Sequence, residues 1–119
     1  MSRAKGNHYE TMAKDYLINA GCQIICTNYE SLCGELDLII QDHQEIAFIE
    51  VKYRKNNLYG GAAQAVNKAK QRKIIKTAQH YLVKNKNYAK MPCRFDVLCI
   101  DGNLTVEWLK HAFVMHTNF

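Results

Sequence analysis

The chain has 119 residues and a formal net charge of +5, with 48% hydrophobic and 23% charged residues. This composition is typical of one globular domain over residues 1–119, and the lack of any run of about 18 apolar residues excludes a membrane-spanning helix. The five cysteines include no C-x-x-C pair, and the segment after Met1 has no apolar leader, so we expect a reducing, cytoplasmic environment.

The first predicted element is an amphipathic helix from about Tyr9 to Ala20. Apolar residues recur there in steps of three and four, which indicates one buried helix face. Asn7 is a suitable N-cap, and Gly21 is suited to the position that ends a helix.

Three strands are predicted next, two of them paired as a hairpin. A short apolar strand over residues 22–27 is followed by a loop over residues 28–34. Strands over residues 36–40 and 46–53 are then joined by a turn at residues 42–44. These two strands are apolar at nearly every position, which is typical of central strands covered on both faces.

A long helix is predicted after the Gly60-Gly61 pair, which interrupts the chain. It begins at Ala63 or Asn67 and ends at Lys84. Its apolar side chains fall mainly on one face and its lysines mostly on the other, so we expect it to pack against the sheet.

Two further strands complete the predicted fold. They cover residues 94–100 and 104–109, and the Asp-Gly-Asn turn at residues 101–103 joins them. The resulting order, α-β-β-β-α-β-β, predicts an α/β fold with a mixed five-stranded sheet flanked by helices.

Three charged residues, Asp37, Glu50 and Lys52, interrupt the two apolar central strands. Because side chains alternate along a strand, Glu50 and Lys52 share a face, and hairpin pairing can bring Asp37 beside Glu50. Two carboxylates about 4 Å apart repel by roughly 4 kcal/mol at an effective dielectric constant near 20. We therefore expect that one carboxyl group takes a proton, that a lysine intervenes, or that a cation binds between them.

A divalent cation is the alternative with chemical consequences. Mg²⁺ prefers oxygen ligands, typically one or two carboxylates together with water and phosphate oxygens. Lys52 could then position water for attack on phosphorus or stabilise charge on the phosphoryl oxygens. The competing structural interpretation is an exposed face on which Asp37, Glu50 and Lys52 form a weak cross-strand ion pair. Glu35 alternates with Asp37 and competes for a role near the strand entry.

The sequences Gly-Glu-Leu-Asp at residues 34–37 and Glu-Val-Lys-Tyr-Arg at residues 50–54 resemble the PD-(D/E)xK signature of restriction endonuclease-like nucleases. Over nearly its full length the chain is similar to the YraN-like family of bacterial proteins, which is related to archaeal Holliday-junction resolvases. Two departures are Leu36 in place of the proline of the signature and Glu30 where the family often has arginine.

This resemblance implies a restriction endonuclease-like fold in which Asp37, Glu50 and Lys52 are the catalytic residues. It implies that Asp37 and Glu50 bind Mg²⁺ or Mn²⁺, and that Glu10 on the first helix is an additional acid directed at the metal. The alternative for Glu10 is an exposed carboxylate near the positive end of the helix dipole.

The basic residues are concentrated in one part of the chain. Residues 51–95 contain twelve basic residues and no acidic one, while all eleven acidic residues lie elsewhere. Such segregation favours a polyanionic partner over a merely solvated lysine face. The candidate nucleic-acid contacts are Arg54, Lys70, Arg72 and Lys73. Phosphate contacts of this kind give affinity without reading sequence, so we expect recognition of nucleic-acid shape or ends and not of a base sequence.

Two functions therefore remain open from the sequence. The first is a Mg²⁺- or Mn²⁺-dependent endonuclease acting on structured or branched DNA. The second is a nucleic-acid-binding accessory protein that keeps the nuclease fold without turnover. A homodimer is possible in the first case, because one small domain cannot easily cut both strands symmetrically.

Overall fold

A five-stranded sheet forms the centre of the protein in a computed structural model, which describes the backbone of residues 3–55 and 66–114 and the side chains of residues 8–55 and 66–114. The sheet order follows the chain order, from β1 to β5. Neighbouring strands are antiparallel except for β3 and β4, which are parallel. The strands are β1 (Gln23–Ser31), β2 (Gly34–Asp42), β3 (Glu45–Arg54), β4 (Cys93–Asp101) and β5 (Val106–Phe113).

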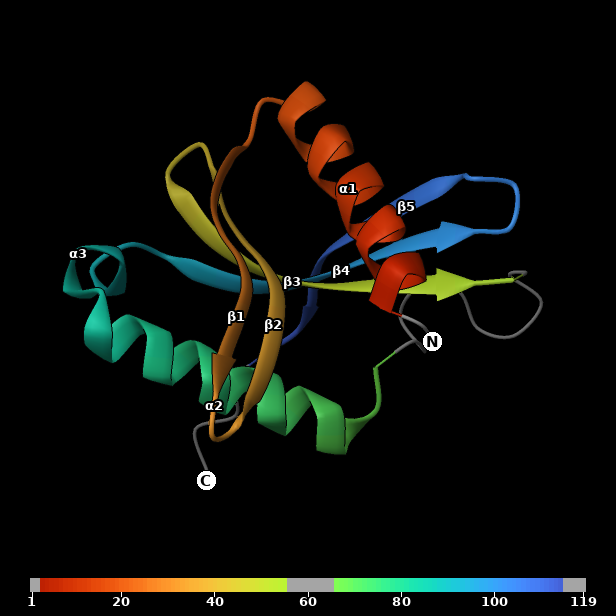
Figure 1. The fold of residues 1–119 in the computed structure, drawn as a ribbon. Coiled ribbons are helices and arrows are strands. Elements are labelled where there is room, and N and C mark those ends of the chain that lie inside the picture. Colours follow the sequence, from red (N-terminus) through yellow and green to blue (C-terminus); the bar gives the residue numbers. More distant parts are fainter. Residues whose placement is uncertain (1–2, 56–65, 115–119) are drawn as a thin grey trace.

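Helices cover both faces of this sheet, with α1 on one face and α2 on the other (Figure 1). The helices are α1 (Arg3–Asn19), α2 (Lys68–Lys84) and the single-turn α3 (Lys86–Ala89). The predicted fold class and the order α-β-β-β-α-β-β are confirmed, with α3 as an addition that the sequence analysis did not predict. None of the helices in residues 3–55 and 66–114 is long and apolar enough to cross a membrane.

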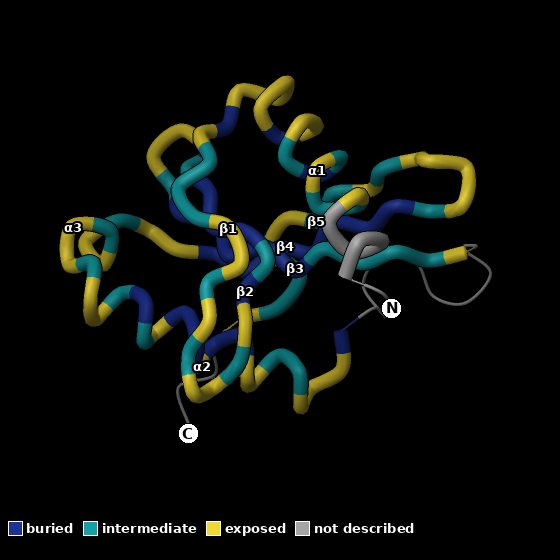
Figure 2. Tube along the Cα trace, viewed as in Figure 1, coloured by how far each residue is buried: buried dark blue, intermediate teal, exposed yellow. Residues whose placement is uncertain are grey.

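The core consists of two apolar layers separated by the sheet. On one side, Ala13 and Leu17 of α1 pack over the central strands, and on the other side Ile74, Ile75 and Ala78 of α2 do so. Figure 2 shows the buried residues gathered in the central strands and on the inner faces of the helices. The central strands are thus covered on both faces, as their apolar sequence predicts.

The two ends of α1 differ in how well local sequence predicts them. At the C-terminal end, the amide of Gly21 donates to the carbonyl of Ile18 and that of Cys22 to the carbonyl of Leu17, both at 3.0 Å. Gly21 has φ of +92°, so this is a Schellman motif and the predicted stop is confirmed. The N-cap prediction for Asn7 is wrong, because the helix begins at Arg3, in a segment without apolar periodicity.

The predicted loop over residues 28–34 is wrong, because β1 continues to Ser31 and pairs with β2 as far as Gly34. The end of β1 is polar, so the sequence lacks the alternation of apolar and polar residues that would indicate a strand there. Gly34 has φ of +150°, and a Cβ built on it would lie 3.2 Å from Oγ1 of Thr77 in α2. The glycine of the Gly-Glu-Leu-Asp sequence therefore lets the β1–β2 hairpin approach α2 closely.

The predicted start of the second helix at Asn67 is confirmed. The side-chain oxygen of Asn67 accepts a hydrogen bond of 2.8 Å from the Lys70 amide, so Asn67 is the N-cap of α2. The alternative start at Ala63 and the Gly60-Gly61 interruption lie outside the described residues.

The remaining predicted strands are confirmed with somewhat different bounds. Strands β2 and β3 are joined across residues 43–44, and both are longer than predicted. Strand β4 matches the prediction within one residue at each end, whereas β5 begins two residues later and ends four residues later than expected. The predicted antiparallel hairpin of β2 and β3, which carries Asp37, Glu50 and Lys52, is therefore confirmed.

Candidate functional site

The candidate site lies where the pairing between β2 and β3 ends. The antiparallel register runs from the turn to the Leu38–Ile49 pair. Figure 1 shows β3 leaving β2 toward its own C-terminal end, with the N-terminal half of α2 below the two strands. At this point the Val51 amide donates a hydrogen bond of 2.8 Å to Oδ2 of Asp37. A side chain thus takes the place of a backbone acceptor, which fixes the Asp37 carboxyl group beside β3.

Glu50 is the buried member of the site, with 5% of its surface exposed. Its Oε2 atom is buried and has no hydrogen-bond partner in the part of the chain that the structure describes. Two half-exposed lysines approach it from different elements. Nζ of Lys52 lies 3.9 Å from Oε1, and Nζ of Lys70 lies 4.0 Å from Oε2. The structure therefore brings together three of the predicted residues and adds Lys70.

The electrostatics of the carboxylate pair favour a bound proton or a cation. Burial raises the pKa of Glu50 to about 8, the charge of Asp37 acts in the same direction, and Lys70 and Lys52 oppose the shift. Burial also raises the pKa of Asp37, against the hydrogen bond from Val51. Without a cation, the pair therefore retains a proton near neutral pH.

Replacing Glu50 by glutamine should change how stability depends on pH. Below its ordinary pKa, a carboxyl group is protonated in both the folded and the unfolded protein. As the pH rises toward the raised pKa of the folded protein, ionisation favours the unfolded state, so stability is lost over this interval. For Glu50 this window runs from about 4.5 to about 8. Between pH 5 and pH 8 in EDTA, the advantage of Glu50→Gln over the wild type should grow by about 3 to 4 kcal/mol. Urea unfolding at several pH values measures this, and parallel pH profiles would contradict it.

The donor atoms of the pair fit a hard divalent cation. Asp37 and Glu50 offer carboxylate oxygens, and the unpartnered Oε2 of Glu50 is an acceptor without a donor. No group of three or more Asp, Glu, His or Cys side chains suited to a metal occurs among the described residues. Two carboxylates suffice for Mg²⁺, which keeps water and substrate ligands, but not for a structural zinc site, which needs four protein ligands.

The other acidic candidates, Glu10 and Glu35, do not form a group of three with the pair among the described residues. Glu10 of α1 lines a small pocket of about 130 Å³ together with Lys14, Asn28 and other residues of α1, β1 and β2. The metal-directed role of Glu10 stays a prediction. Glu35 is exposed, and its charge contributes to the raised pKa of Asp37, so it acts on the pair electrostatically.

The four predicted nucleic-acid contacts come from two elements, β3 and α2. Lys70 is directed to Glu50. Arg54 ends β3, opposite Asp101 of β4. Arg72 and Lys73 are both exposed on α2, but consecutive helical residues point about 100° apart. The approach of Lys70 to Glu50 is not predictable from the sequence, although the Asn67 cap places Lys70 in the first turn of α2.

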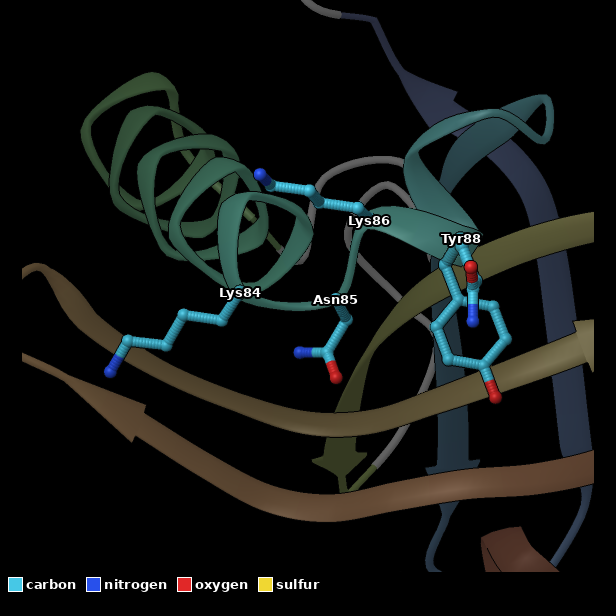
Figure 3. A pocket seen from close by; sticks show the side chains of 5 residues that line it. Lys84, Asn85, Lys86 and Tyr88 are labelled. Carbon is cyan, nitrogen blue, oxygen red and sulfur yellow. The ribbon is translucent and has the colours of Figure 1, made fainter.

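A second open pocket, of about 640 Å³, lies at the junction of α2 and α3 (Figure 3). It is lined by Lys84, Asn85, Lys86, Asn87 and Tyr88. Figure 3 shows Lys84 and Tyr88 pointing away from each other. Since the lining contains no carboxylate and its side chains do not converge, this pocket is not the candidate chemical site.

A second charged cluster, which we call the Arg94 network, lies near the turn between β2 and β3. Arg94 is 3% exposed and its guanidinium group binds Asp96 at 3.1 Å, Asp42 at 2.7 Å and Glu45 at 3.2 Å. Asp96 also accepts hydrogen bonds from the Trp108 indole and from a backbone amide of β5. Each carboxylate of the network accepts a hydrogen bond from Arg94, whereas Oε2 of Glu50 accepts none among the described residues, so we interpret the network as structural.

Burial alone would raise the pKa of Asp42 in this network. Hydrogen bonds from Arg94, His43 and Lys110 outweigh that effect and hold the pKa of Asp42 well below its usual range. The carboxylate therefore stays ionised in the folded protein, and its stabilising interactions are lost only in strong acid.

The family model and the similar proteins found by comparison all belong to one family. The profile of the uncharacterised protein family UPF0102 matches residues 9–100. A UPF0102 protein of Vibrio parahaemolyticus is 45% identical over 111 residues, which is 92% of each chain, and one of Saccharophagus degradans is 39% identical over 93% of each chain. The UPF0102 protein YraN of Escherichia fergusonii is 38% identical over 98% of this chain and 88% of its own length.

Proposed function

The chain belongs to the uncharacterised protein family UPF0102, and we propose that it is a divalent-metal-dependent endonuclease that hydrolyses phosphodiester bonds in structured or branched DNA. The observation that carries the proposal is the pair formed by the half-buried Asp37 and the buried Glu50, with an unpartnered carboxylate oxygen on Glu50 and Lys52 alongside. The chain's order of elements and mixed sheet agree with the restriction endonuclease-like fold that its sequence resembles.

Each residue of the pair has a role that its surroundings support. Asp37 and Glu50 would hold Mg²⁺ or Mn²⁺, which when bound supplies positive charge next to the phosphate. The Val51 amide keeps the Asp37 carboxyl group in place. Lys52 has its ammonium group 3.9 Å from Oε1 of Glu50 and a half-exposed side chain, so it can orient water or bind a phosphoryl oxygen.

The substrate class follows from the distribution of charge. Arg54, Arg72 and Lys73 belong to the segment that has twelve basic residues and no acidic one, which favours a phosphate backbone as ligand. These side chains come from two elements, β3 and α2, and contacts from two elements suit a nucleic acid whose strands leave in different directions, as at a junction or a flap. They offer phosphate contacts, and such contacts do not discriminate base sequence.

The proposal is tested by incubating the protein with end-labelled four-way junctions, flaps, forks and plain duplexes of one sequence. We expect cleavage near the branch point of at least one branched DNA in Mg²⁺ or Mn²⁺, and none in EDTA. The Asp37→Ala variant, purified in the same way, controls for contaminating nucleases. Equal cleavage by the variant, or no cleavage of any branched substrate, would contradict the proposal.

A second candidate function is supported by the two lysines beside Glu50. Because Lys52 and Lys70 already place positive charge near the pair, the site can be balanced without a cation. The protein would then be an accessory protein that binds nucleic acid without cutting it. This function predicts salt-sensitive DNA binding that survives Asp37→Ala, together with no calorimetric signal for Mg²⁺ in the millimolar range.

A further inference from the structure

We propose that Lys70 is the built-in counter-ion of the Asp37–Glu50 pair, which a divalent cation displaces, and that the displaced ammonium group binds the substrate phosphate. This inference rests on the proposed nuclease function and adds a lysine that competes with the cation at the same site. It assigns Lys70 to the reaction centre and not to general backbone binding.

The position of Lys70 is fixed by the start of α2. The Lys70 amide donates to Oδ1 of Asn67 at 2.8 Å, and the Gln71 amide donates to the Asn67 carbonyl at 2.9 Å. This cap holds the first turn of the helix, from which the Lys70 side chain extends to Glu50. The basic group therefore comes from a different layer of the fold than Asp37, Glu50 and Lys52, which all lie on the sheet.

The contact between Lys70 and Glu50 is electrostatic and incomplete. Nζ of Lys70 is 4.0 Å from Oε2 of Glu50, beyond hydrogen-bond distance, and Oε2 has no other partner among the described residues. Glu50 itself is buried, whereas the Lys70 side chain is 40% exposed. The lysine thus supplies charge to the pair but leaves the oxygen available to a ligand that binds more closely.

A cation bound to Oε2 and an ammonium group beside the same oxygen repel each other. Glu50 is fixed within β3, but the lysine side chain is long, flexible and partly in solvent, so Lys70 is the group that moves. Its movement places a positive charge at the mouth of the site, where a phosphate diester must approach. Competition with the cation and attraction of the phosphate are therefore two consequences of the same charge.

Lys73 provides a matched control on the same helix. It is exposed one turn beyond Lys70, and its Cβ lies 3.7 Å from the position of a Cβ built on Gly34, beside the β1–β2 hairpin. Removing its charge should weaken DNA binding without changing the competition at Glu50.

The test is a Mn²⁺ titration of the DNA-free protein at low salt, at one pH high enough to ionise both carboxyl groups in the wild type and the variants, by calorimetry and by electron paramagnetic resonance of free Mn²⁺. We expect Lys70→Met to bind Mn²⁺ about tenfold more tightly than the wild type and to cleave DNA at least about tenfold more slowly at saturating metal. Lys73→Met should keep the wild-type metal affinity. Lys70→Gln serves as a second variant if the methionine variant does not fold.

The titration separates this inference from the proposed function. Wild-type binding of Mn²⁺ tests the metal site itself, and its absence would overturn both. A second outcome is that the wild type binds Mn²⁺ and cleaves DNA, but Lys70→Met and Lys70→Gln bind Mn²⁺ no more tightly than the wild type. In that case the nuclease function stands and the counter-ion role of Lys70 is overturned. Unchanged cleavage by a tighter-binding Lys70 variant would overturn the phosphate role.

Discussion

Replacing Asp37 by asparagine should reduce the cleavage rate by about 100- to 1,000-fold and leave DNA affinity within about threefold. Asparagine keeps the size of the side chain and can still accept the hydrogen bond from the Val51 amide, so the local backbone should be preserved. The charge is lost, and with it one of the two carboxylates that would hold the cation. The effect therefore belongs to the chemical step and not to substrate binding.

The matched control for this prediction is Glu35→Gln. Glu35 lies two residues before Asp37 on the same strand, but it is exposed. Its replacement should change the cleavage rate by less than about threefold, because exposed charges act weakly at a distance. Single-turnover cleavage and fluorescence anisotropy measure the rate and the affinity separately. Equal losses of rate in both variants, or a loss of affinity that accounts for the Asp37→Asn rate, would contradict the assignment.

Replacing Arg94 by methionine should destabilise the protein by about 3 to 5 kcal/mol. Arg94 is 3% exposed and its guanidinium group binds Asp42, Glu45 and Asp96, of which Asp96 is fully buried. Methionine fills most of the volume but leaves two buried carboxylates without their main partner. Those carboxyl groups must then remain charged in a buried environment without a counter-ion, or bind protons, and either outcome lowers the free energy of unfolding.

Lys110→Met is the control within the same network. Nζ of Lys110 lies 3.0 Å from Oδ2 of Asp42, but its side chain is 48% exposed, so its loss should cost less than about 1 kcal/mol. Chemical unfolding of both variants at pH 7 gives the two values. A loss below 1 kcal/mol for Arg94→Met would show that the Arg94 network does not hold β4 to the turn between β2 and β3.

The sequence was sufficient to predict that Asp37 and Glu50 meet. Two facts of local geometry were needed, the alternation of side chains along strands and the pairing of two apolar strands as a hairpin, and both are visible in the residues. The start of α2 at Asn67 and the stop of α1 at Gly21 were predictable for the same reason, because caps depend on residues close in sequence.

Features that depend on packing between distant segments were not predictable in this way. The approach of Lys70 to Glu50 requires the angle at which α2 crosses the sheet, which no local pattern encodes. The polar part of β1 has the composition of a loop, because this exposed end of the strand lacks apolar alternation and is defined only by its pairing with β2.

The Arg94 network shows a further limit of sequence reasoning. Arg94 and Asp96 interrupt the apolar β4 just as Asp37 and Glu50 interrupt β2 and β3, so the patterns are equivalent in sequence. The structure separates the two cases by their partners. Asp96 accepts from three donor groups, whereas Oε2 of Glu50 has none in the described residues. A buried charge indicates a functional site only when its partners are incomplete.

The most direct test of the metal site is anomalous diffraction from a crystal of the protein soaked in Mn²⁺ near pH 8. At this pH the carboxyl group of Glu50 can lose its proton. We predict an anomalous peak within coordination distance of carboxylate oxygens of both Asp37 and Glu50, with Lys70 shifted away from Oε2. A crystal saturated with Mn²⁺ at other sites, but with no peak at this pair and Lys70 still beside Glu50, would contradict the account.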